Sequence, residues 1–348
     1  MSTLLNRSCP APLKHSTIQL AHGGGGRLMR QLIEEVFLEP PPALAWTERH
    51  DSAVVPLGTE RLALTTDSYV VTPRFFPGGD IGKLAVYGTV NDLVMSGARP
   101  LYLSAGFILE EGLAMEELRR VVASMREAAR ECGVRLVTGD TKVVDRGKAD
   151  GLFINTSGAG HVPEGRSVHP RRVRPGDAVL VSGDVGQHGI AVLSVREGLA
   201  FETPVQSDCS PLTPLVEALF SAGVDVHALR DTTRGGLASA LNELALDGGV
   251  SVLLEETSVP VNEAVSGACE LLGLDPLYVA CEGRMVAFVP EPQAEVALAA
   301  LRGHPLGVAA ARIGRVTEGP AGRVSLRTRL GGHRLLDLLS GEQLPRIC

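Results

Sequence analysis

Short apolar segments of strand length alternate with longer segments of helical periodicity along most of this 348-residue chain. Residues 62–66 and 101–109 are of the first kind, whereas residues 81–96 and 115–132 place apolar side chains at three- and four-residue spacings. Such alternation is typical of strands that bury a face against helices. We therefore predict an α/β (α+β) fold.

A stretch rich in Pro, Gly and Arg, residues 163–177, interrupts this alternation, which then resumes as far as about residue 316. We expect a domain boundary near residue 170, because exposed linkers have this composition. The chain would then comprise an extension at 1–16, an N-terminal domain at 17–169, a second α/β domain at 170–335 and a tail at 336–348.

Composition and charge disfavour several classes of function. Lys and Arg number 33 and Asp and Glu 40, so the net charge of −7 argues against nucleic acid or an anionic membrane as the main partner. No apolar run approaches the roughly 18 residues that span a bilayer, and the N-terminus has no apolar signal core. The six cysteines are scattered without a CxxC pair, which disfavours a zinc site or a disulfide framework. We expect a soluble, cytoplasmic protein.

Four consecutive glycines, Gly23–Gly26, lie between a predicted short strand at 17–21 and a predicted helix from Arg27 to about Leu38. Backbone N–H groups in such a turn can surround a phosphate. The run matches neither the P-loop nor the dinucleotide fingerprint, so a flexible turn remains the alternative.

Three acids, Asp67, Asp92 and Asp140, lie at the ends of predicted strands or in a helix. Carboxylates at strand ends point into the crevice where α/β folds bind ligands, and several together can hold Mg²⁺. Taken singly, each is equally explained as a helix cap or a turn residue.

Further residues could carry chemistry, each with a structural alternative. Lys142 could neutralise phosphate or assist proton transfer, or be a solvated loop lysine. The RDTTRGG segment at 230–236 could bind an anion or simply cap a helix. Glu282 lies in an apolar stretch, where burial would make it a general base unless it is a paired structural carboxylate. The terminal Cys348 could carry covalent cargo on a flexible tail, although its chemistry alone is ambiguous.

Taken together, the segments are similar to those of a known family. AHGGGGRLM, TTDSYVV, FFPGGDIGKLAVYGTVNDL, VTGDTKVV, RDTTRGGLASALNE and the terminal LPRIC resemble the HypE family of hydrogenase maturation proteins. That family belongs to the ATP-dependent superfamily of aminoimidazole ribonucleotide synthetase and selenophosphate synthetase. The resemblance covers residues 17–348, with departures at Gln187, Thr232 and Cys281, where Asp, Pro and Asn are expected.

The resemblance implies a two-domain, aminoimidazole-ribonucleotide-synthetase-like fold. It also implies a homodimer whose N-terminal ATP-binding domains join their sheets into a barrel, and a flexible C-terminal tail. Magnesium would be held by Asp67, Asp92 and Asp140. The residues expected to bind ATP are Gly23, Gly24, Gly25, Gly26, Asp67, Asn91, Asp92, Asp140 and Thr141.

The implied reaction is ATP-dependent dehydration of a carboxamide on the Cys348 sulfur to a thiocyanate. The carbamoyltransferase HypF would load the thiol, and the HypC–HypD iron scaffold would receive the cyanide ligand for a [NiFe]-hydrogenase. Glu282 and Lys142 are the candidate bases. Two alternatives stay open: a selenophosphate synthetase using Cys9, and a non-catalytic scaffold whose tail docks on a partner.

Overall fold

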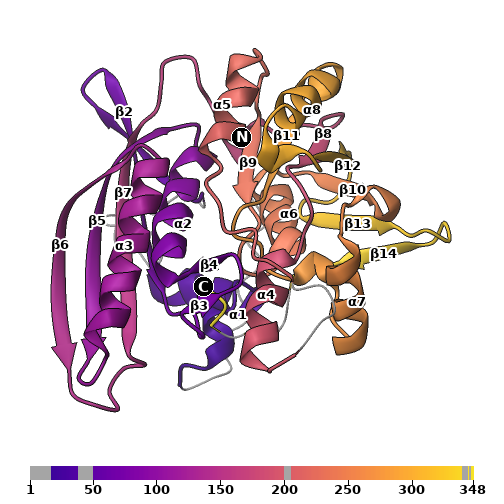
Figure 1. Ribbon diagram of the computed structural model, residues 1–348. Helices are drawn as coiled ribbons and strands as arrows, with labels where there is room; N and C mark the ends of the chain where they lie inside the picture. Colours follow the sequence, from indigo (N-terminus) through magenta and orange to yellow (C-terminus); the bar gives the residue numbers. More distant parts are fainter. Residues whose placement is uncertain (1–16, 38–49, 200–204, 339–343, 345) are drawn as a thin grey trace.

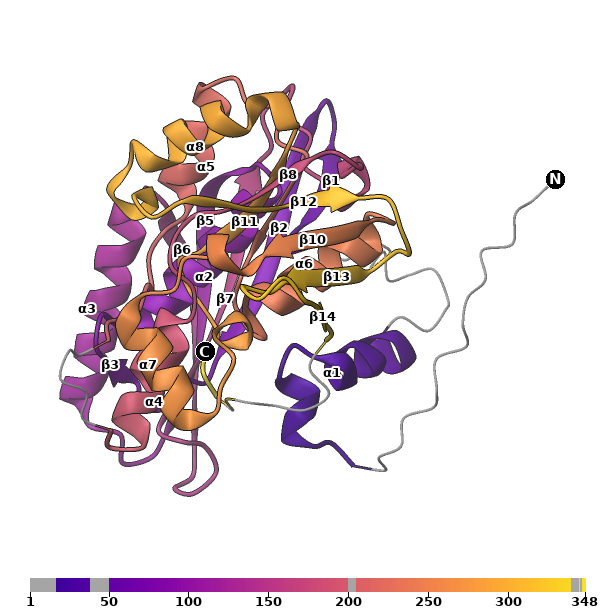
Figure 2. The same ribbon diagram turned by 90° about the vertical axis from the view of Figure 1, so that its right-hand side faces the viewer.

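Two β-sheets organise the computed structural model, which describes residues 17–37, 50–199, 205–338, 344 and 346–348 (Figures 1 and 2). The N-terminal sheet has five strands in the order β1-β2-β7-β5-β6, with only the β5–β6 pair parallel. Helices α2 and α3 cover one of its faces (Figure 1). The strands are β1 (Ala53–Leu57), β2 (Glu60–Tyr69), β5 (Arg99–Glu110), β6 (Arg135–Val144) and β7 (Leu152–His161), and the helices are α2 (Ile81–Met95) and α3 (Met115–Glu131).

Helix α2 lies between this sheet and the C-terminal half of the chain (Figure 1). All of its residues except Lys83 and Asp92 are buried, as its run of small and apolar residues predicts. It begins at Asp80, whose carboxylate accepts hydrogen bonds from the backbone N–H groups of Gly82 and Lys83. Its Asn91 and Asp92 are thereby held at the junction of the two halves.

The second sheet has seven strands in the order β14-β13-β10-β12-β8-β11-β9, and only β10 and β13 are parallel. Each half of the chain therefore has its own sheet, with helices packed on it. The strands are β8 (Ala178–Val181), β9 (Ala228–Asp231), β10 (Ser251–Glu255), β11 (Met285–Val289), β12 (Ala311–Thr317), β13 (Arg323–Arg327) and β14 (His333–Leu336). The helices are α4 (Gln187–Arg196), α5 (Thr213–Ser221), α6 (Gly236–Asp247), α7 (Glu263–Leu272) and α8 (Ala294–Arg302).

The face of the N-terminal sheet opposite α2 and α3 carries no other element of the described chain (Figure 1). Strands β1 and β6 are its two edges, so the sheet does not close into a barrel within one chain. Leu64, Tyr102 and Ile108 lie on this face with 41 to 45 % of their surface exposed.

Several local predictions need correction. The segment 17–21 is not a strand: the chain enters a 3₁₀ helix at Leu20–Gly23, followed by α1 (Arg27–Leu32) and a π-helical turn to Phe37. Neither Asp67 nor Asp140 ends a strand, because β2 and β6 continue beyond them. The sequence patterns also missed β1, β13, β14 and the small hairpin of β3 (Phe75–Phe76) and β4 (Gly79–Asp80).

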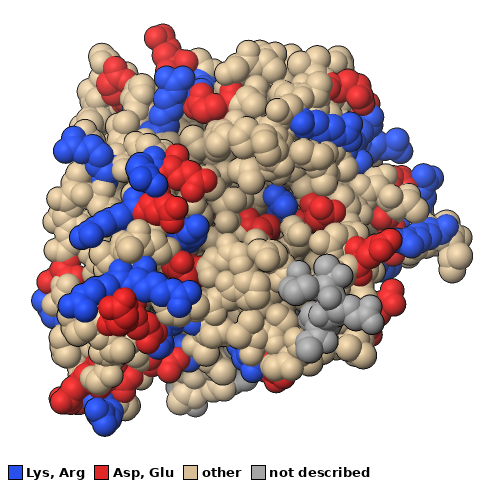
Figure 3. Space-filling model, in the orientation of Figure 1, with Lys and Arg blue, Asp and Glu red and all other residues tan. Residues whose placement is uncertain are grey.

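Acidic and basic side chains are interspersed on the face shown in Figure 3. No helix in the described part of the chain combines the length and apolar character needed to cross a bilayer.

Candidate active site

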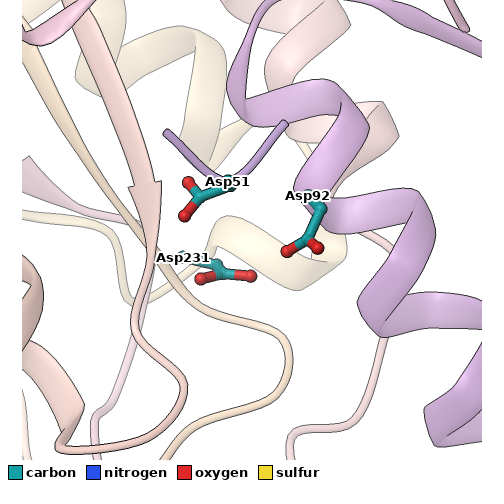
Figure 4. A group of neighbouring side chains, drawn as sticks. All are labelled: Asp51, Asp92 and Asp231. Atoms are coloured by element: carbon teal, nitrogen blue, oxygen red, sulfur yellow. The ribbon is translucent and has the colours of Figure 1, made fainter. Parts of the chain in front are cut away.

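Three carboxylates meet at the junction of the two halves. Side-chain oxygens of Asp51, Asp92 and Asp231 all lie within 4.8 Å of one another. Figure 4 shows them pointing toward a common centre. Asp51 comes from the segment before β1, Asp92 from α2 and Asp231 from the end of β9. The cluster therefore exists only when the two halves are packed together.

The surroundings of this cluster are unfavourable for three negative charges alone. Burial raises the pKa of all three acids, that of Asp231 to about 6, and the charge of Asp231 further raises the pKa of Asp51 and Asp92. Arg230 compensates in part, with its Nε 2.9 Å from Asp51 Oδ1. The second oxygen of Asp51 is buried without a hydrogen-bond partner among the described residues. An array of hard oxygen donors with one unsatisfied atom fits a divalent cation such as Mg²⁺.

The predicted metal set overlaps this cluster only at Asp92. Asp67 lies close enough to raise the pKa of Asp92 and Asp231, and its Oδ1 is 3.8 Å from Arg234 Nη2. Sequence reasoning missed Asp51 and Asp231 as members. Asp231 belongs to the RDTTRGG segment, whose pattern predicts an anion site or a helix cap, and Asp51 has no signal beyond preceding a short apolar run.

Asp140 lies elsewhere in the single chain. Pairing across the sheet places Asp67 beside Thr156, then Ala105, then Gly139, so Asp140 occupies the opposite, open face three strands away. At about 4.8 Å per strand this is about 14 Å. Its carboxylate is 2.8 Å from Lys142 Nζ, and that hydrogen bond lowers its pKa. Within one chain, Asp140, Thr141 and Lys142 do not join the acids.

The glycine run rests against the RDTTRGG segment. Gly25 has φ +73°, and a Cβ there would come within 2.9 Å of Arg234 Cβ and its carbonyl oxygen. Arg234 also donates to the carbonyl of Gly23 at 3.4 Å. Only glycine allows both this backbone conformation and this approach. The contact brings residues 23–26 close to Asp67 through Arg234.

Glu282 is buried at 4 % exposure, and its Oε1 has no hydrogen-bond partner among the described residues. Burial raises its pKa well above the ordinary value, with further contributions from Asp231 and Asp67. Its backbone is held on both sides: the N–H donates to Asp208 at 3.2 Å, and the carbonyl accepts from Asn91 at 3.3 Å. The free carboxylate oxygen therefore has a defined position.

Asn91 uses its whole amide within the chain. Besides the bond to Glu282, its Nδ2 donates to the carbonyl of Ser210 at 3.1 Å and its Oδ1 accepts from the N–H of Leu212 at 2.7 Å. In this structure the residue positions the loop around Glu282. Its role toward ATP stays a prediction.

Cys348 is docked at the same place, with 8 % of its surface exposed. Its terminal carboxylate accepts a hydrogen bond from the N–H of Val70 at 3.0 Å. Burial raises the pKa of its thiol, the Arg234 guanidinium opposes that rise, and Glu282 and Asp67 add to it. The structure thus brings together Cys348, Glu282, Arg234 and the acids. Cys9 lies outside the described residues.

Comparisons with known proteins identify the family. Models of the AIR synthase related protein N-terminal and C-terminal domains match residues 49–162 and 174–327. The carbamoyl dehydratase HypE of Rhodobacter capsulatus is 54 % identical over 338 residues, covering 97 % of this chain and 99 % of that protein.

Solved structures agree. A hydrogenase maturation protein HypE in complex with ATP has 53 % identity and a TM-score of 0.81, covering 95 % of this chain and 100 % of that chain. A HypE–HypF complex matches with 47 % identity and a TM-score of 0.82, covering 88 and 99 %. These relatives confirm the predicted two-domain α/β fold and the enzyme class, and favour it over the two alternatives. The chain belongs to the carbamoyl dehydratase HypE family of hydrogenase maturation proteins, within the AIR synthase related proteins.

Proposed function

We propose that this chain dehydrates a carboxamide carried on the Cys348 sulfur to a thiocyanate, at the expense of ATP. The observation that carries the proposal is the docking of Cys348 in a buried site with Glu282, whose Oε1 lacks a partner among the described residues. A HypE–HypF complex and an ATP complex among the relatives support HypF and ATP as partner and cosubstrate.

The chemistry follows from the groups present. Oxide is a poor leaving group, so the carboxamide oxygen is first phosphorylated by ATP and then departs as phosphate. One N–H proton leaves as the oxygen is phosphorylated and a C=N bond forms, and the second leaves as phosphate departs and the C≡N bond forms. Glu282 is the proposed base, because burial gives its carboxylate a high proton affinity. Arg234, close to Asp67 and the Cys348 thiol, would stabilise negative charge on the departing oxygen.

The protonation state of the Cys348 thiol indicates that loading and dehydration occur in different positions of this residue. Burial raises the pKa of docked Cys348, so the docked thiol is a poor nucleophile. A carbamoylated sulfur is neutral and suits the same buried site. We therefore propose that HypF loads Cys348 while residues 346–348 are undocked. These residues would then dock for dehydration and leave again to deliver cyanide to the HypC–HypD scaffold in the cytoplasm.

Magnesium would be held by Asp51, Asp92 and Asp231, where it would neutralise charge on the phosphates of ATP. The N–H groups of Gly23–Gly26 would contribute to phosphate binding beside Arg234. This proposed set differs from Asp67, Asp92 and Asp140, the set that the resemblance implies, and shares only Asp92 with it.

Asp140 can contribute only if a second chain supplies it. We propose a homodimer in which the open faces of two N-terminal sheets meet and form a barrel. The exposed Leu64, Tyr102 and Ile108 support this, because an apolar sheet face is normally covered. Strand β6 would then approach the partner, carrying Asp140, Thr141 and Lys142. The proposed domain limits remain 17–169 and 170–335.

The test is mass spectrometry of the C-terminal peptide that a glutamate-specific protease releases after Glu342. The protein is incubated with HypF, carbamoyl phosphate and ATP. We expect a carbamoyl adduct on Cys348 that loses one water only when ATP is present. An adduct that keeps its water with ATP, or appears on another cysteine, would contradict the proposal.

A further inference from the structure

One face of helix α4 contacts the C-terminal segment along its length. His188, Val192 and Arg196 are spaced four residues apart and so lie above one another on the helix. His188 and Arg196 hydrogen-bond to the backbone of residues 347 and 346, Val192 belongs to the buried cluster that contains Ile347 and Cys348, and none of the three belongs to the acid cluster.

His188 is the first contact. Its Nε2 lies 2.8 Å from the carbonyl oxygen of Ile347, and its Nδ1 lies 2.8 Å from Ser207 Oγ. A carbonyl only accepts, so Nε2 carries the proton, and Nδ1 accepts from the Ser207 hydroxyl. That hydroxyl in turn accepts from the N–H of Cys209 at 3.0 Å. The network therefore assigns one neutral tautomer, and burial lowers the pKa of His188, which maintains it.

The ring of His188 is also fixed by packing. It meets Phe76 edge-on, with ring centroids 5.2 Å apart and an interplanar angle of 87°. The imidazole of His188 can therefore bind residues 346–348 without rotating and without changing its tautomer. His188 is thus a preorganised donor aimed at one backbone carbonyl.

Arg196 is the contact at the other end of the helix. Its Nη2 donates to the carbonyl of Arg346 at 2.7 Å, and its Nε donates to the carbonyl of Thr72 at 2.8 Å. Between the two polar contacts, Val192 belongs to the same buried cluster as Ile347. Helix α4 therefore places a donor at the carbonyl of Ile347, an apolar side chain in the cluster that contains Ile347, and a second donor at the carbonyl of Arg346.

The segment Val70–Thr72 forms the other wall. Val70 N–H donates to the terminal carboxylate of Cys348 at 3.0 Å and Thr72 N–H donates to the Arg346 carbonyl at 3.3 Å, an antiparallel register. With His188, every backbone oxygen position from 346 to 348 has a donor. Two of these bonds join neutral groups, and the other two involve the Arg196 guanidinium or the terminal carboxylate of Cys348. Together they hold the segment in one register.

We propose that α4 is the docking site of residues 346–348 and that His188 is a positioning residue, which sets how deeply the Cys348 sulfur enters the active site. The consequence for chemistry rests on the function proposed above. A sulfur displaced by ~1 Å would lower the rate of dehydration by ~10².

The first arm of the test needs neither ATP nor a partner. Cys348 is labelled with iodoacetamide in the free protein, and the rate is read on the C-terminal peptide. We expect His188→Phe, which retains a ring but no donor, to label about tenfold faster. His188→Gln, whose Nε2 can still donate, should stay near the wild-type rate.

Arg196→Met provides an independent variant at the other end of α4, in case His188→Phe does not fold. It keeps the apolar stem and removes the donors to Arg346, so Cys348 should again label faster. Wild-type labelling rates in both His188→Phe and Arg196→Met would overturn the proposal.

The second arm measures dehydration of carbamoylated protein in a single turnover. We expect His188→Phe to be ~10²-fold slower with unchanged ATP affinity, and His188→Gln to recover most of the rate. Slow dehydration in His188→Phe with unaltered labelling would overturn the positioning role. Faster labelling in the variants, together with no dehydration by the wild type, would support docking on α4 and contradict the proposed function instead.

Discussion

The terminal carboxylate of Cys348 accepts a hydrogen bond from the N–H of Val70, a residue 278 positions earlier in the chain, at 3.0 Å. Val70 directly follows β2, the strand that carries Asp67. This one backbone contact brings the reactive thiol beside the acids that the N-terminal sheet and α2 contribute. The predictions below separate the thiol, the base, the acids and the sheet face.

Replacing Glu282 with Gln should stop the reaction after loading. The amide retains the shape of the side chain but cannot accept a proton, so thiocyanate formation should fall by ~10²–10⁴ while the carbamoyl adduct accumulates. Mass spectrometry of the C-terminal peptide measures both species. Glu270→Gln on the surface is the matched control. Thiocyanate formation at the wild-type rate would show that Glu282 is not the base, and Lys142 would then be the next candidate.

Cys348→Ser should abolish all cyano-group formation, because the hydroxyl is a far weaker nucleophile than the thiol. Folding and ATP binding should persist, since the substitution changes one atom in a site that already holds a polar group. Far-UV circular dichroism and ATP titration check these two properties. Delivery of cyanide to the iron scaffold by the Ser variant would refute the carrier role.

The acids of the cluster should be essential for ATP turnover. Asp51→Asn, Asp92→Asn and Asp231→Asn each remove one charge that would face Mg²⁺, and each should cost ~10²–10³ in rate. Phosphate release on carbamoylated protein is the measurement, and the exposed Asp145→Asn is the control. Normal turnover in any of the three would exclude that residue as a ligand.

Stability should depend on pH through Asp231. Its pKa is about 6 in the folded protein and 3.8 in an unfolded chain. Between these values the unfolded state has released a proton that the folded state retains, so the free energy of unfolding should fall as pH rises, by about 3 kcal/mol in total.

Urea unfolding of the metal-free protein at pH 4 and pH 7 measures this effect, and Asp231→Asn should remove that part of the pH dependence. Added Mg²⁺ should oppose the loss at pH 7, because it binds the ionised acids. Equal pH dependence in the wild type and Asp231→Asn would contradict the assignment.

Tyr102→Glu should disrupt the proposed homodimer, because it places a charge on the open face of the N-terminal sheet. Sedimentation should show a monomer, and ATP turnover should fall if the partner supplies Asp140. Leu330→Glu, at a side chain that is 99 % exposed, is the control. A monomeric variant with full activity would place the whole site in one chain, and Asp140→Asn should then also be active.

Long elements with strong periodicity were predictable. The helices at 81–96 and 115–132 and the strand at 101–109 are present within one or two residues, because each is a long segment with a consistent apolar pattern. The strand expected at 17–21 is wrong, and β13 and β14 were missed. Those segments are only four or five residues long, so their own pattern is too short to specify a strand and their structure depends on the neighbours they meet.

The sequence by itself determined the family, the α/β class and the chemically capable residues Glu282 and Cys348, because motifs and periodicity are local properties. Only the tertiary structure decided which acids meet. Asp51 and Asp231 are 180 residues apart, and Asp140 lies near Asp92 in the chain but on the opposite sheet face from Asp67. Successive side chains of a strand point to opposite faces of the sheet, so moving an acid by one residue would place it on the other face. Its neighbours in the site come from segments remote in sequence, so only the strand order decides which acids meet.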